Sequence, residues 1–233
     1  MKLYILYKNE NDTERFIKEY LKYPLAGEYF NEQILSTANE QLKKDRILSR
    51  RLLYTVCEKE LGRAPSQIGY NKSGKPCFTD GSASFSISHT KNLILLAFEC
   101  GSCNLGADVQ IDADRERLSR VYERFKNNIP TEFNCEELFV EEITLCNVRT
   151  NFFTLRRMST DLPGVTDFSR VDTCGKTDPL TAWTLTEAVL KAEGEGFGAI
   201  CRCKDISKDY SVASFNLKIG GKAFSISVAK AVV

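Results

Sequence analysis

Apolar residues recur at helical spacing in three segments of the chain. The longest is 37–61, whose apolar positions share one face and comprise Leu42, Leu48, Leu52, Leu53 and Val56. Gly62 follows it, as is typical just beyond a helix C-terminus. Residues 115–125 also follow a helical pattern, and a third helix is expected over 181–193 with Thr181 as its N-cap.

Strand patterns surround these helices. Residues 85–88, FSIS, alternate like a half-buried strand, whereas 93–99, LILLAFE, form a continuous apolar run that suits a more buried strand. Further strands are expected at 3–7, 104–111, 211–219 and 223–233. The last two would form a hairpin across Gly220 and Gly221.

Two stretches of the chain are nearly the same: FSISHTK at 85–91 and FSISVAK at 224–230. They differ where the first contains His89, the only histidine. By its place in the order of elements, the second stretch corresponds to 93–99. The shared letters then reflect the alternation of any half-buried strand, and the difference at a strand end is expected to carry the function.

The remaining segments are less regular. Residues 68–85 are rich in Gly, Ser, Asn and Pro and predict loops and turns, and 162–181 also have a loop pattern. Residues 136–145 fit either a helix or a strand. The order strand, helix, strands, helix, strands predicts an α+β fold. We expect two similar halves, 1–110 and 111–233, related by a pseudo-twofold axis, each a small antiparallel sheet packed on a long helix.

The composition is that of an ordinary globular protein. The chain has 233 residues, of which 42% are hydrophobic and 27% are charged, as in ordinary globular domains. Its 32 basic and 31 acidic residues give a net charge of +1, so bulk charge gives no reason to expect binding to nucleic acid or to a membrane. The chain has neither a signal-peptide pattern nor an apolar run of roughly 20 residues. A soluble, cytoplasmic protein is expected, with its nine cysteines mostly small buried residues.

Three short motifs contain polar residues at places where chemistry is often found. Lys75 lies on a Gly-Lys-Pro turn that could hold a phosphate, although such turns are more often plain surface turns. Ser88 and His89 end a strand, and His89 is either a titrating or phosphate-contacting group or a structural histidine. Asp108 lies in a short apolar strand and needs a partner, for which Mg²⁺ is a candidate; otherwise it caps a turn.

Trp183, Glu187 and Lys191 are spaced four residues apart, so they share one face of the expected helix. Taken alone, Glu187 and Lys191 would indicate only a solvated ion pair worth roughly 0.3–0.5 kcal/mol. Glu187 and Lys191 would indicate a functional site only if other motifs predicted a site at the same place.

The cysteines suggest a separate hypothesis. Cys100 and Cys103 resemble a zinc or redox half-site, which Cys201 and Cys203 could complete. The second pair lacks the usual gap of two to four residues, which counts against zinc. A short strand follows the first pair where a redox motif would have a helix.

Five motifs of this chain resemble, in the same order, those of the 4′-phosphopantetheinyl transferase superfamily, in its larger-subunit class typified by the activating enzyme of surfactin synthetase. They read DRILSRRLL, GKPCF, FSISHTKNLILLAFE, LGADVQ and WTLTEAVLKAEGEGF. The family has an Arg-bearing helix, GKP, a strand ending in SH, G-[IV]-D-x-E, and W-x-x-K-E-[SA]-x-x-K before a Gly-rich segment. The resemblance covers about 39–111 and 181–200, and the tail matches only in its strand pattern.

The resemblance implies a reaction. A serine hydroxyl of an apo acyl, peptidyl or aryl carrier protein would attack the β-phosphorus of coenzyme A, taking up 4′-phosphopantetheine and releasing 3′,5′-ADP. Mg²⁺ would neutralise the pyrophosphate oxygens. Its protein ligands would be Asp108 and Glu187, with the amide of Gln110 in the position of a third ligand.

The resemblance also implies roles for individual residues. Glu187, directly or through a water, would remove the serine proton, and Lys191 would stabilise or protonate the leaving phosphate. With Asp108 these two residues form the catalytic set. The nucleotide phosphates of coenzyme A would be held by Arg46, Lys75, Pro76, Ser88, His89 and Lys191.

The chain departs from the family pattern at several positions. Gln110 stands where the family has a third metal-binding carboxylate, so weaker metal binding is expected. Thr186 replaces the Lys that usually precedes the Glu, which removes one positive charge near the phosphates. Residues 26–42 lack the basic residues that some relatives have there. The segment 126–180 is longer than expected, and is either an insertion or the carrier-docking segment.

Two other functions compete with an active transferase. One is a relative that binds coenzyme A or a carrier protein but has a weakened metal site, a reading that rests on Gln110 and Thr186. The other is a zinc- or redox-linked binding module built on the four cysteines. Because one chain would contribute both halves of a complete site, we expect a monomer.

Overall fold

The computed structural model describes residues 1–8, 13–18, 34, 36–65, 68–72, 74–130, 133, 138–148, 153–173 and 177–232. The strands are β1 (Lys2–Tyr7), β2 (Ile68–Tyr70), β3 (Pro76–Phe78), β4 (Ala83–His89), β5 (Leu93–Cys100), β6 (Leu105–Ile111), β7 (Glu142–Val148), β8 (Phe153–Arg157), β9 (Val165–Val171), β10 (Tyr210–Ile219) and β11 (Lys222–Ala231). The helices include α3 (Glu40–Leu61), α4 (Arg115–Phe125), α5 (Pro179–Glu193) and α6 (Cys203–Ile206), with short 3-10 turns η1 (Asp112–Asp114), η2 (Gly196–Arg202) and η3 (Ser207–Asp209), and residues 13–18 are also helical. This mixture confirms the α+β class. Among the described residues, no helix has the length and apolar character needed to cross a membrane.

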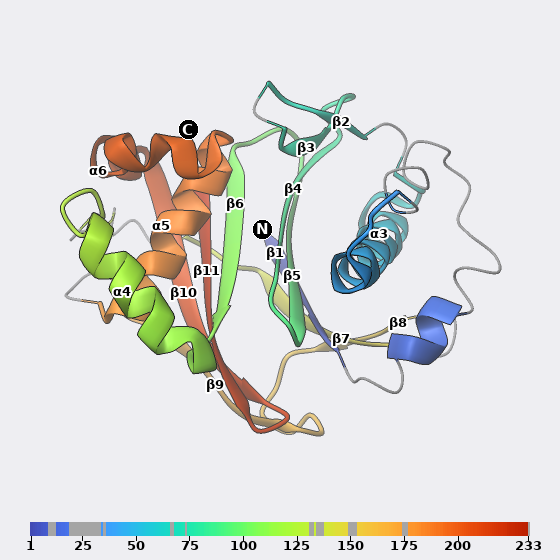
Figure 1. The fold of residues 1–233 in the computed structure, drawn as a ribbon. Helices are drawn as coiled ribbons and strands as arrows, with labels where there is room; N and C mark the ends of the chain where they lie inside the picture. Colours follow the sequence, from blue (N-terminus) through green and yellow to red (C-terminus); the bar gives the residue numbers. More distant parts are fainter. Residues whose placement is uncertain are drawn as a thin grey trace.

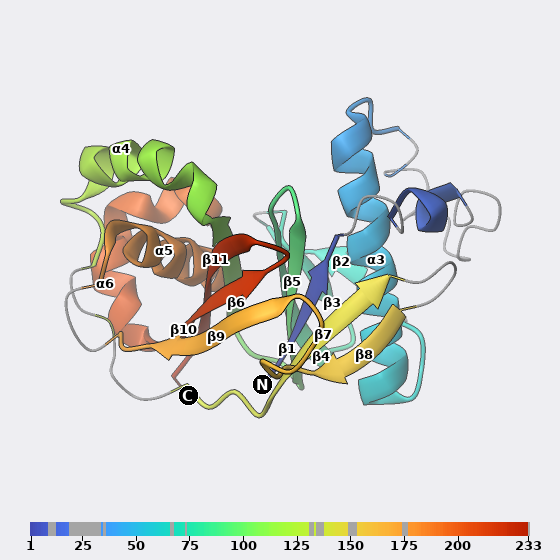
Figure 2. The same ribbon diagram turned by 90° about the horizontal axis from the view of Figure 1, so that it is seen from below.

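The strands form two larger sheets that lie between helices (Figures 1 and 2). One sheet has the strand order β4-β5-β1-β7-β8, and the other has the order β6-β11-β10-β9. The first sheet is mixed and not antiparallel as predicted, because β7 runs parallel to β1. α3 packs on the outer face of the first sheet and α5 on that of the second. The layers therefore run helix, sheet, sheet, helix.

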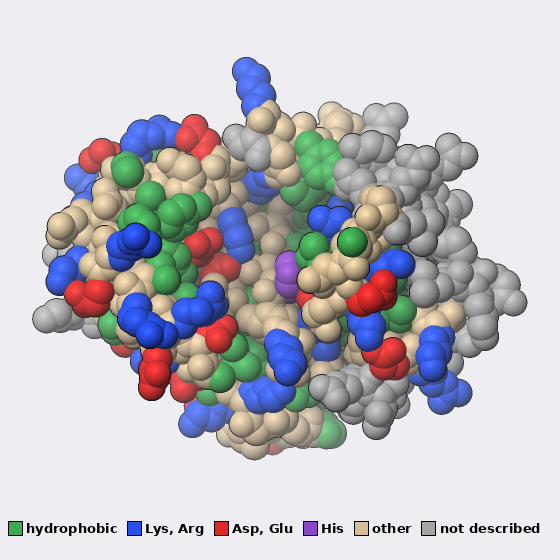
Figure 3. Space-filling view, in the orientation of Figure 1, with side chains coloured by type: hydrophobic (Ala, Val, Ile, Leu, Met, Phe, Trp, Pro, Cys, Tyr) green, Lys and Arg blue, Asp and Glu red, His purple; other side chains and the backbone are tan. Residues whose placement is uncertain are grey.

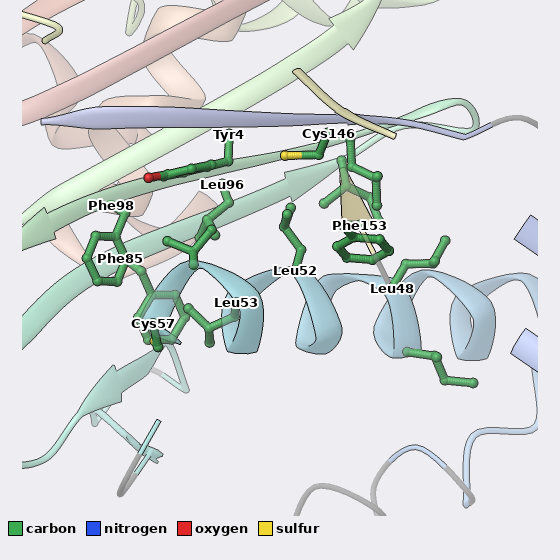
Figure 4. Packing of buried hydrophobic residues seen from close by; sticks show 14 of the residues in the cluster. Tyr4, Leu48, Leu52, Leu53, Cys57, Phe85, Leu96, Phe98, Cys146 and Phe153 are labelled. Carbon is green, nitrogen blue, oxygen red and sulfur yellow. The ribbon is translucent and has the colours of Figure 1, made fainter. Parts of the chain in front are cut away.

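The strands β1 and β5 are buried on both faces, as the apolar run at 93–99 predicted. Leu3 and Ile5 pack between the two sheets, whereas Tyr4 and Leu6 pack on the side of α3. Figure 4 shows this second layer, in which Leu48, Leu52 and Leu53 of the helix face the strands. Each such buried aliphatic side chain stabilises the fold by roughly 1.5–3 kcal/mol.

The long helix has the ends that its sequence predicts, to within a few residues. The side chain of Asn39 accepts a hydrogen bond of 2.9 Å from the backbone N–H of Leu42 and so caps the N-terminus. Gly62 follows the last turn in the left-handed conformation, as expected. The helix buries two polar side chains that the sequence pattern did not single out, Asp45 and Ser49.

Three local predictions were wrong or incomplete. The N-cap of α5 is Asp178, which accepts from Leu180 N, and Thr181 instead donates its hydroxyl to Asp178. β9 lies within 162–181, predicted as loop, because the edge of β10 offers backbone partners to a segment with little apolar alternation. The turn-rich segment 68–85 contains the short ribbon of β2 and β3 as well as the start of β4. The ambiguous segment 136–145 contributes its last residues to β7.

The two sheets approach each other along β4 and β6 through serine side chains. Ser84, Ser86 and Ser88 alternate along β4, and each hydroxyl oxygen accepts a hydrogen bond from a backbone N–H at or before β6. The donors are Cys103, Ala107 and Val109, at N–O distances of 2.8, 3.0 and 3.4 Å. We call this set of contacts the serine seam.

The similar stretch 224–230 lies in β11, which pairs with both β10 and β6. β11 is thus a central strand, as is β5, which pairs with β4 and β1. Its serines also differ from those of β4, because Ser227 pairs with Ser214 inside the same sheet at 2.8 Å. The two FSIS stretches therefore have different structural roles.

Candidate active site

A glycine allows α5 to lie directly on β6. A Cβ atom at Gly106 would stand 1.9 Å from the carbonyl oxygen of Ala188 and 2.5 Å from the nitrogen of Ala192. Only a residue without a side chain fits this contact. The close approach brings Asp108, two residues further along β6, beside Lys191 of α5.

Asp108, Ser88 and Lys191 form a closed set of hydrogen bonds. The Lys191 ammonium donates to Asp108 Oδ1 at 2.6 Å and to Ser88 Oγ at 2.9 Å, and Ser88 Oγ donates to the same Asp108 oxygen at 2.8 Å. Asp108 is only 2% exposed. A buried carboxylate requires such partners, because an unpaired charge in the interior is very costly.

Glu187 lies one helical turn before Lys191 and is half-buried. Burial raises the pKa of its carboxyl, the nearby Asp108 carboxylate raises that pKa further, and Lys191 opposes the shift. Within the described part of the chain, no hydrogen bond compensates the Glu187 carboxylate. The site thus contains two neighbouring carboxylates, Asp108 and Glu187. The Lys191 ammonium only partly offsets the repulsion between them.

Gln110 completes the surroundings of Asp108. Its Nε2 donates to Asp108 Oδ2 at 2.9 Å. The amide nitrogen rather than the amide oxygen therefore faces the carboxylate. To coordinate a metal together with Asp108, as the sequence suggested, Gln110 would have to rotate its amide group by half a turn.

His89 ends β4 beside this set, with 43% of its side chain exposed. Its Nε2 lies 4.0 Å from Oδ2 of Asp45 on α3. Burial lowers the pKa of the imidazole, and the Asp45 carboxylate opposes that shift. His89 therefore links the Lys191 cluster to a second group of charges around Asp45.

The Gly-Lys-Pro turn reaches the same region by packing on the end of α5. Gly194, in the left-handed conformation after α5, would clash with Asn71 if it had a Cβ, at 2.6 Å from Nδ2. The Lys75 ammonium donates to the carbonyl oxygen of Leu105 at 2.7 Å. Burial lowers the pKa of Lys75 to about 8. Lys75 is thus a half-buried cation whose side chain connects the turn to β6.

These elements surround a pocket of about 250 Å³. It is lined by the turn residues Gly74, Lys75 and Pro76, by 85–87 of β4, and by Lys191, Gly194 and Gly196 at the end of α5. Figure 3 shows a hollow between the two halves of the surface, in which the imidazole lies near basic and acidic side chains. Three of the sequence motifs therefore line one pocket, and a fourth, LGADVQ, contacts them through Leu105 and Asp108.

Two residues of the family pattern lie further from this set. Arg46 is exposed on α3 and donates to the hydroxyl of Thr37 at 2.7 Å. Thr186 is fully buried and donates to the carbonyl of Ala182 at 2.8 Å, so its hydroxyl is used inside α5. Pro76, by contrast, lines the pocket directly.

The cysteine hypothesis gains no support from the geometry. Cys100, Cys103, Cys201 and Cys203 are free thiols. The described residues contain no group of three or more His, Cys, Asp or Glu side chains placed to hold a metal ion. A four-cysteine zinc site would require such a group.

Sequence reasoning missed Lys8 and Asp45, which form a buried ion pair of 2.7 Å beside His89. A signal for Asp45 was available. Asp45 precedes Leu48 and Leu52 by three and seven residues, so it belongs to the apolar face of the helix. A carboxylate on such a face needs a buried partner.

Taken together, an acidic pair and several basic side chains lie in or beside this pocket. The acidic pair is Asp108 and Glu187, and the basic side chains are Lys75 and Lys191 in the pocket wall and His89 at the adjoining end of β4. No protein-family model matches this chain, and no curated protein matches it either.

Proposed function

We propose that the protein transfers 4′-phosphopantetheine from coenzyme A to a serine of an apo acyl, peptidyl or aryl carrier protein, with Mg²⁺. The observation that carries this proposal is the meeting of motifs distant in sequence. Lys191 contacts Ser88 and Asp108, although 103 and 83 residues separate it from them. The Gly-Lys-Pro turn lines the same cleft.

The arrangement of helices and sheets is compatible with the 4′-phosphopantetheinyl transferase superfamily. In the first half, β1 pairs with β5 and β5 with β4, beside α3. In the second, β6 pairs with β11 and β11 with β10, beside α5. We infer that the two halves are related by a pseudo-twofold axis, with β6, at the end of the predicted half 1–110, belonging to the second half that continues through 111–233. The segment 126–180 would be an insertion that adds β7 and β8 to the first sheet and β9 to the second.

The acidic pair would hold a metal ion only together with an amide or water ligand, because the described residues contain no group of three or more His, Cys, Asp or Glu side chains placed for one. Glu187 lacks a compensating partner among the described residues, and its pKa is raised by burial and by Asp108. A cation beside it would offset both the desolvation of the Glu187 carboxylate and its repulsion by Asp108. A bound Mg²⁺ would supply neutralisation of the pyrophosphate oxygens. Asp108 and Glu187 would hold it, with Gln110 through its rotated amide or with a water in its place.

In the proposed reaction, the serine oxygen of the carrier forms a bond to the β-phosphorus, and the bond from that phosphorus to the 3′,5′-ADP oxygen breaks. Glu187, directly or through a water, accepts the serine proton. Its raised pKa makes it a better proton acceptor near neutral pH than an exposed glutamate. Lys191 neutralises or protonates the departing phosphate.

The remaining residues would bind the nucleotide. His89 is exposed at the end of β4, where a phosphate could approach its imidazole, whereas the buried Ser88 would act through its contact with Lys191. Lys75 and Pro76 form one wall of the cleft. Arg46, exposed on α3, would contact a phosphate at the outer edge. All of these residues come from one chain, which supports a monomer.

A second candidate function is binding of coenzyme A or a carrier protein without turnover. Gln110 favours it, because its amide already occupies Oδ2 of Asp108 and contributes no charge to a metal. The retained Glu187 and Lys191 favour the active enzyme.

Incubation of the protein with coenzyme A, Mg²⁺ and several apo carrier proteins tests the proposal. We expect the mass of a carrier to increase by one phosphopantetheine group, and Glu187→Ala or Asp108→Ala to abolish the increase. Glu193→Gln is a matched control, because Glu193 lies on the same helix but bonds Tyr210 at 2.7 Å outside the cleft. No modification of any carrier type, with coenzyme A still bound in a direct binding assay, would favour the second candidate.

A further inference from the structure

Lys8 and Asp45 form the most enclosed ion pair near the cleft. Their side chains are 5% and 6% exposed, and Lys8 Nζ lies 2.7 Å from Asp45 Oδ1. Lys8 directly follows β1, and Asp45 belongs to the first half of α3. The pair therefore joins the end of the central strand to the helix.

The same pair also holds the turn that carries the histidine. Lys8 Nζ donates to the carbonyl oxygen of Thr90 at 2.6 Å, and the Lys8 backbone N–H donates to the carbonyl of Asn92 at 2.8 Å. On the other side, Asp45 Oδ2 faces His89 Nε2 at 4.0 Å. Gln41 steadies the carboxylate with a bond of 3.1 Å to Oδ1.

From these contacts we propose that Lys8 and Asp45 are positioning residues, which fix the turn 89–92 and orient the His89 imidazole toward a phosphate group bound in the cleft. The identity of that phosphate, as part of coenzyme A, rests on the proposed function. The positioning itself rests only on the contacts of Lys8 and Asp45.

The charges around His89 come from four elements. Burial lowers the pKa of the imidazole, and Asp45 of α3 opposes this shift. Lys8, after β1, and Lys191 of α5 lower the pKa further, whereas Asp108 of β6 raises it. Asp45 is therefore the carboxylate with the largest influence on the ring.

The effect of Lys8 and Asp45 on folding stability can be separated from their effect on the orientation of the His89 imidazole. A buried ion pair gains little net stability, because desolvation offsets the attraction, whereas removing one partner leaves an unpaired buried charge. The double variant K8M/D45L removes both charges and should fold. It also removes the side-chain contacts that Lys8 and Asp45 make with the turn.

The first measurement uses the free protein. His89 is the only histidine, so its ring NMR signals need no assignment. We expect these signals to move in K8M/D45L while the melting temperature stays within a few degrees of the parent. Glu60→Gln is the control, since Glu60 is similarly buried, at 8% exposure, near the other end of α3. Its ring signals should match those of the parent.

The second measurement is binding of 3′,5′-ADP and coenzyme A by calorimetry. We expect K8M/D45L to bind about three- to tenfold more weakly, since an unfixed side chain must be ordered on binding. KM for coenzyme A should rise by the same factor while kcat stays within about twofold. Asp45→Glu, with Lys8 retained, should recover part of the affinity.

The two measurements separate the inference from the proposed function. Ring signals that move in K8M/D45L support positioning whatever ligand the cleft takes, and unchanged ring signals overturn it. Failure of the parent protein to bind coenzyme A or modify a carrier counts against the proposed function alone. Equal affinities of parent and double variant for 3′,5′-ADP overturn the role of the pair in binding phosphate.

Discussion

The ammonium of Lys191 on α5 lies 2.9 Å from the hydroxyl oxygen of Ser88 on β4, although 103 residues separate them. Ser88 also contacts Asp108 and the backbone of Val109 on β6. One hydroxyl thus belongs both to the serine seam and to the candidate active site.

Ser88→Ala should lower the free energy of unfolding by about 1–3 kcal/mol, because it leaves buried polar groups without their partner. Urea unfolding measures this difference. Ser84→Ala is the matched control in a more exposed part of the same seam, and should cost less than about 1 kcal/mol because water replaces the hydroxyl. Equal costs at the two positions would contradict the enclosed role of Ser88.

Glu187→Gln should stabilise the metal-free protein at neutral pH. Burial and Asp108 raise the pKa of Glu187, so the folded state holds its proton more tightly than the unfolded chain does. The stability from this group is complete below the unfolded pKa of about 4.3 and is lost as pH rises through the folded pKa. Urea unfolding in EDTA should therefore show similar stabilities near pH 4 and a more stable variant near pH 7.5. A difference that does not change with pH would refute the raised pKa.

Gln110→Glu should make the stability of the protein depend more strongly on Mg²⁺. Without metal, the new carboxylate replaces the amide that bonds Asp108, and like charges repel. With Mg²⁺, the melting temperature should rise by more than in the parent.

Gln41→Glu provides the control for this experiment, because Gln41 donates in the same way to Asp45, away from the acidic pair. It should lower the melting temperature with no recovery in Mg²⁺. An equal response of both variants to Mg²⁺ would remove Gln110 from the proposed metal site.

Gly106→Ala should cost about 3 kcal/mol or more, because its methyl group would meet the backbone of α5 at Ala188. Thermal unfolding and the activity assay should decline together, since Asp108 moves away from Lys191. Gly198→Ala is the control, as no atom lies within 4 Å of its added Cβ. A stable G106A protein would show that β6 and α5 need not touch.

The sequence predicted the elements whose burial is strongly patterned. Residues 93–99 form a strand buried on both faces, which a continuous apolar run located, and 37–61 contain a helix with one apolar face, which helical periodicity located. β9 could not be found in this way, because its polar residues form a strand only where the edge of β10 provides partners. Asp178 was missed as the cap of α5 because Thr181, three residues later, is also a favoured capping residue.

The candidate site was predictable by residue type but not by contact. The motifs singled out Asp108 and Lys191, which the fold brings to 2.6 Å. The bond from Lys75 to the Leu105 carbonyl depends on how the turn packs on β6, which local patterns do not encode. Lys8 lies outside every motif, and only the tertiary fold shows that it holds the histidine turn.

The serine seam has a consequence for how such a cleft can change. Neighbouring strands in a sheet are held in register by backbone groups that every sequence possesses. Between β4 and β6, by contrast, three serine side chains hold the strands in register. Each of these side chains can be replaced by a single substitution. The spacing between the two walls of the cleft can therefore be adjusted one residue at a time, with both sheets left intact.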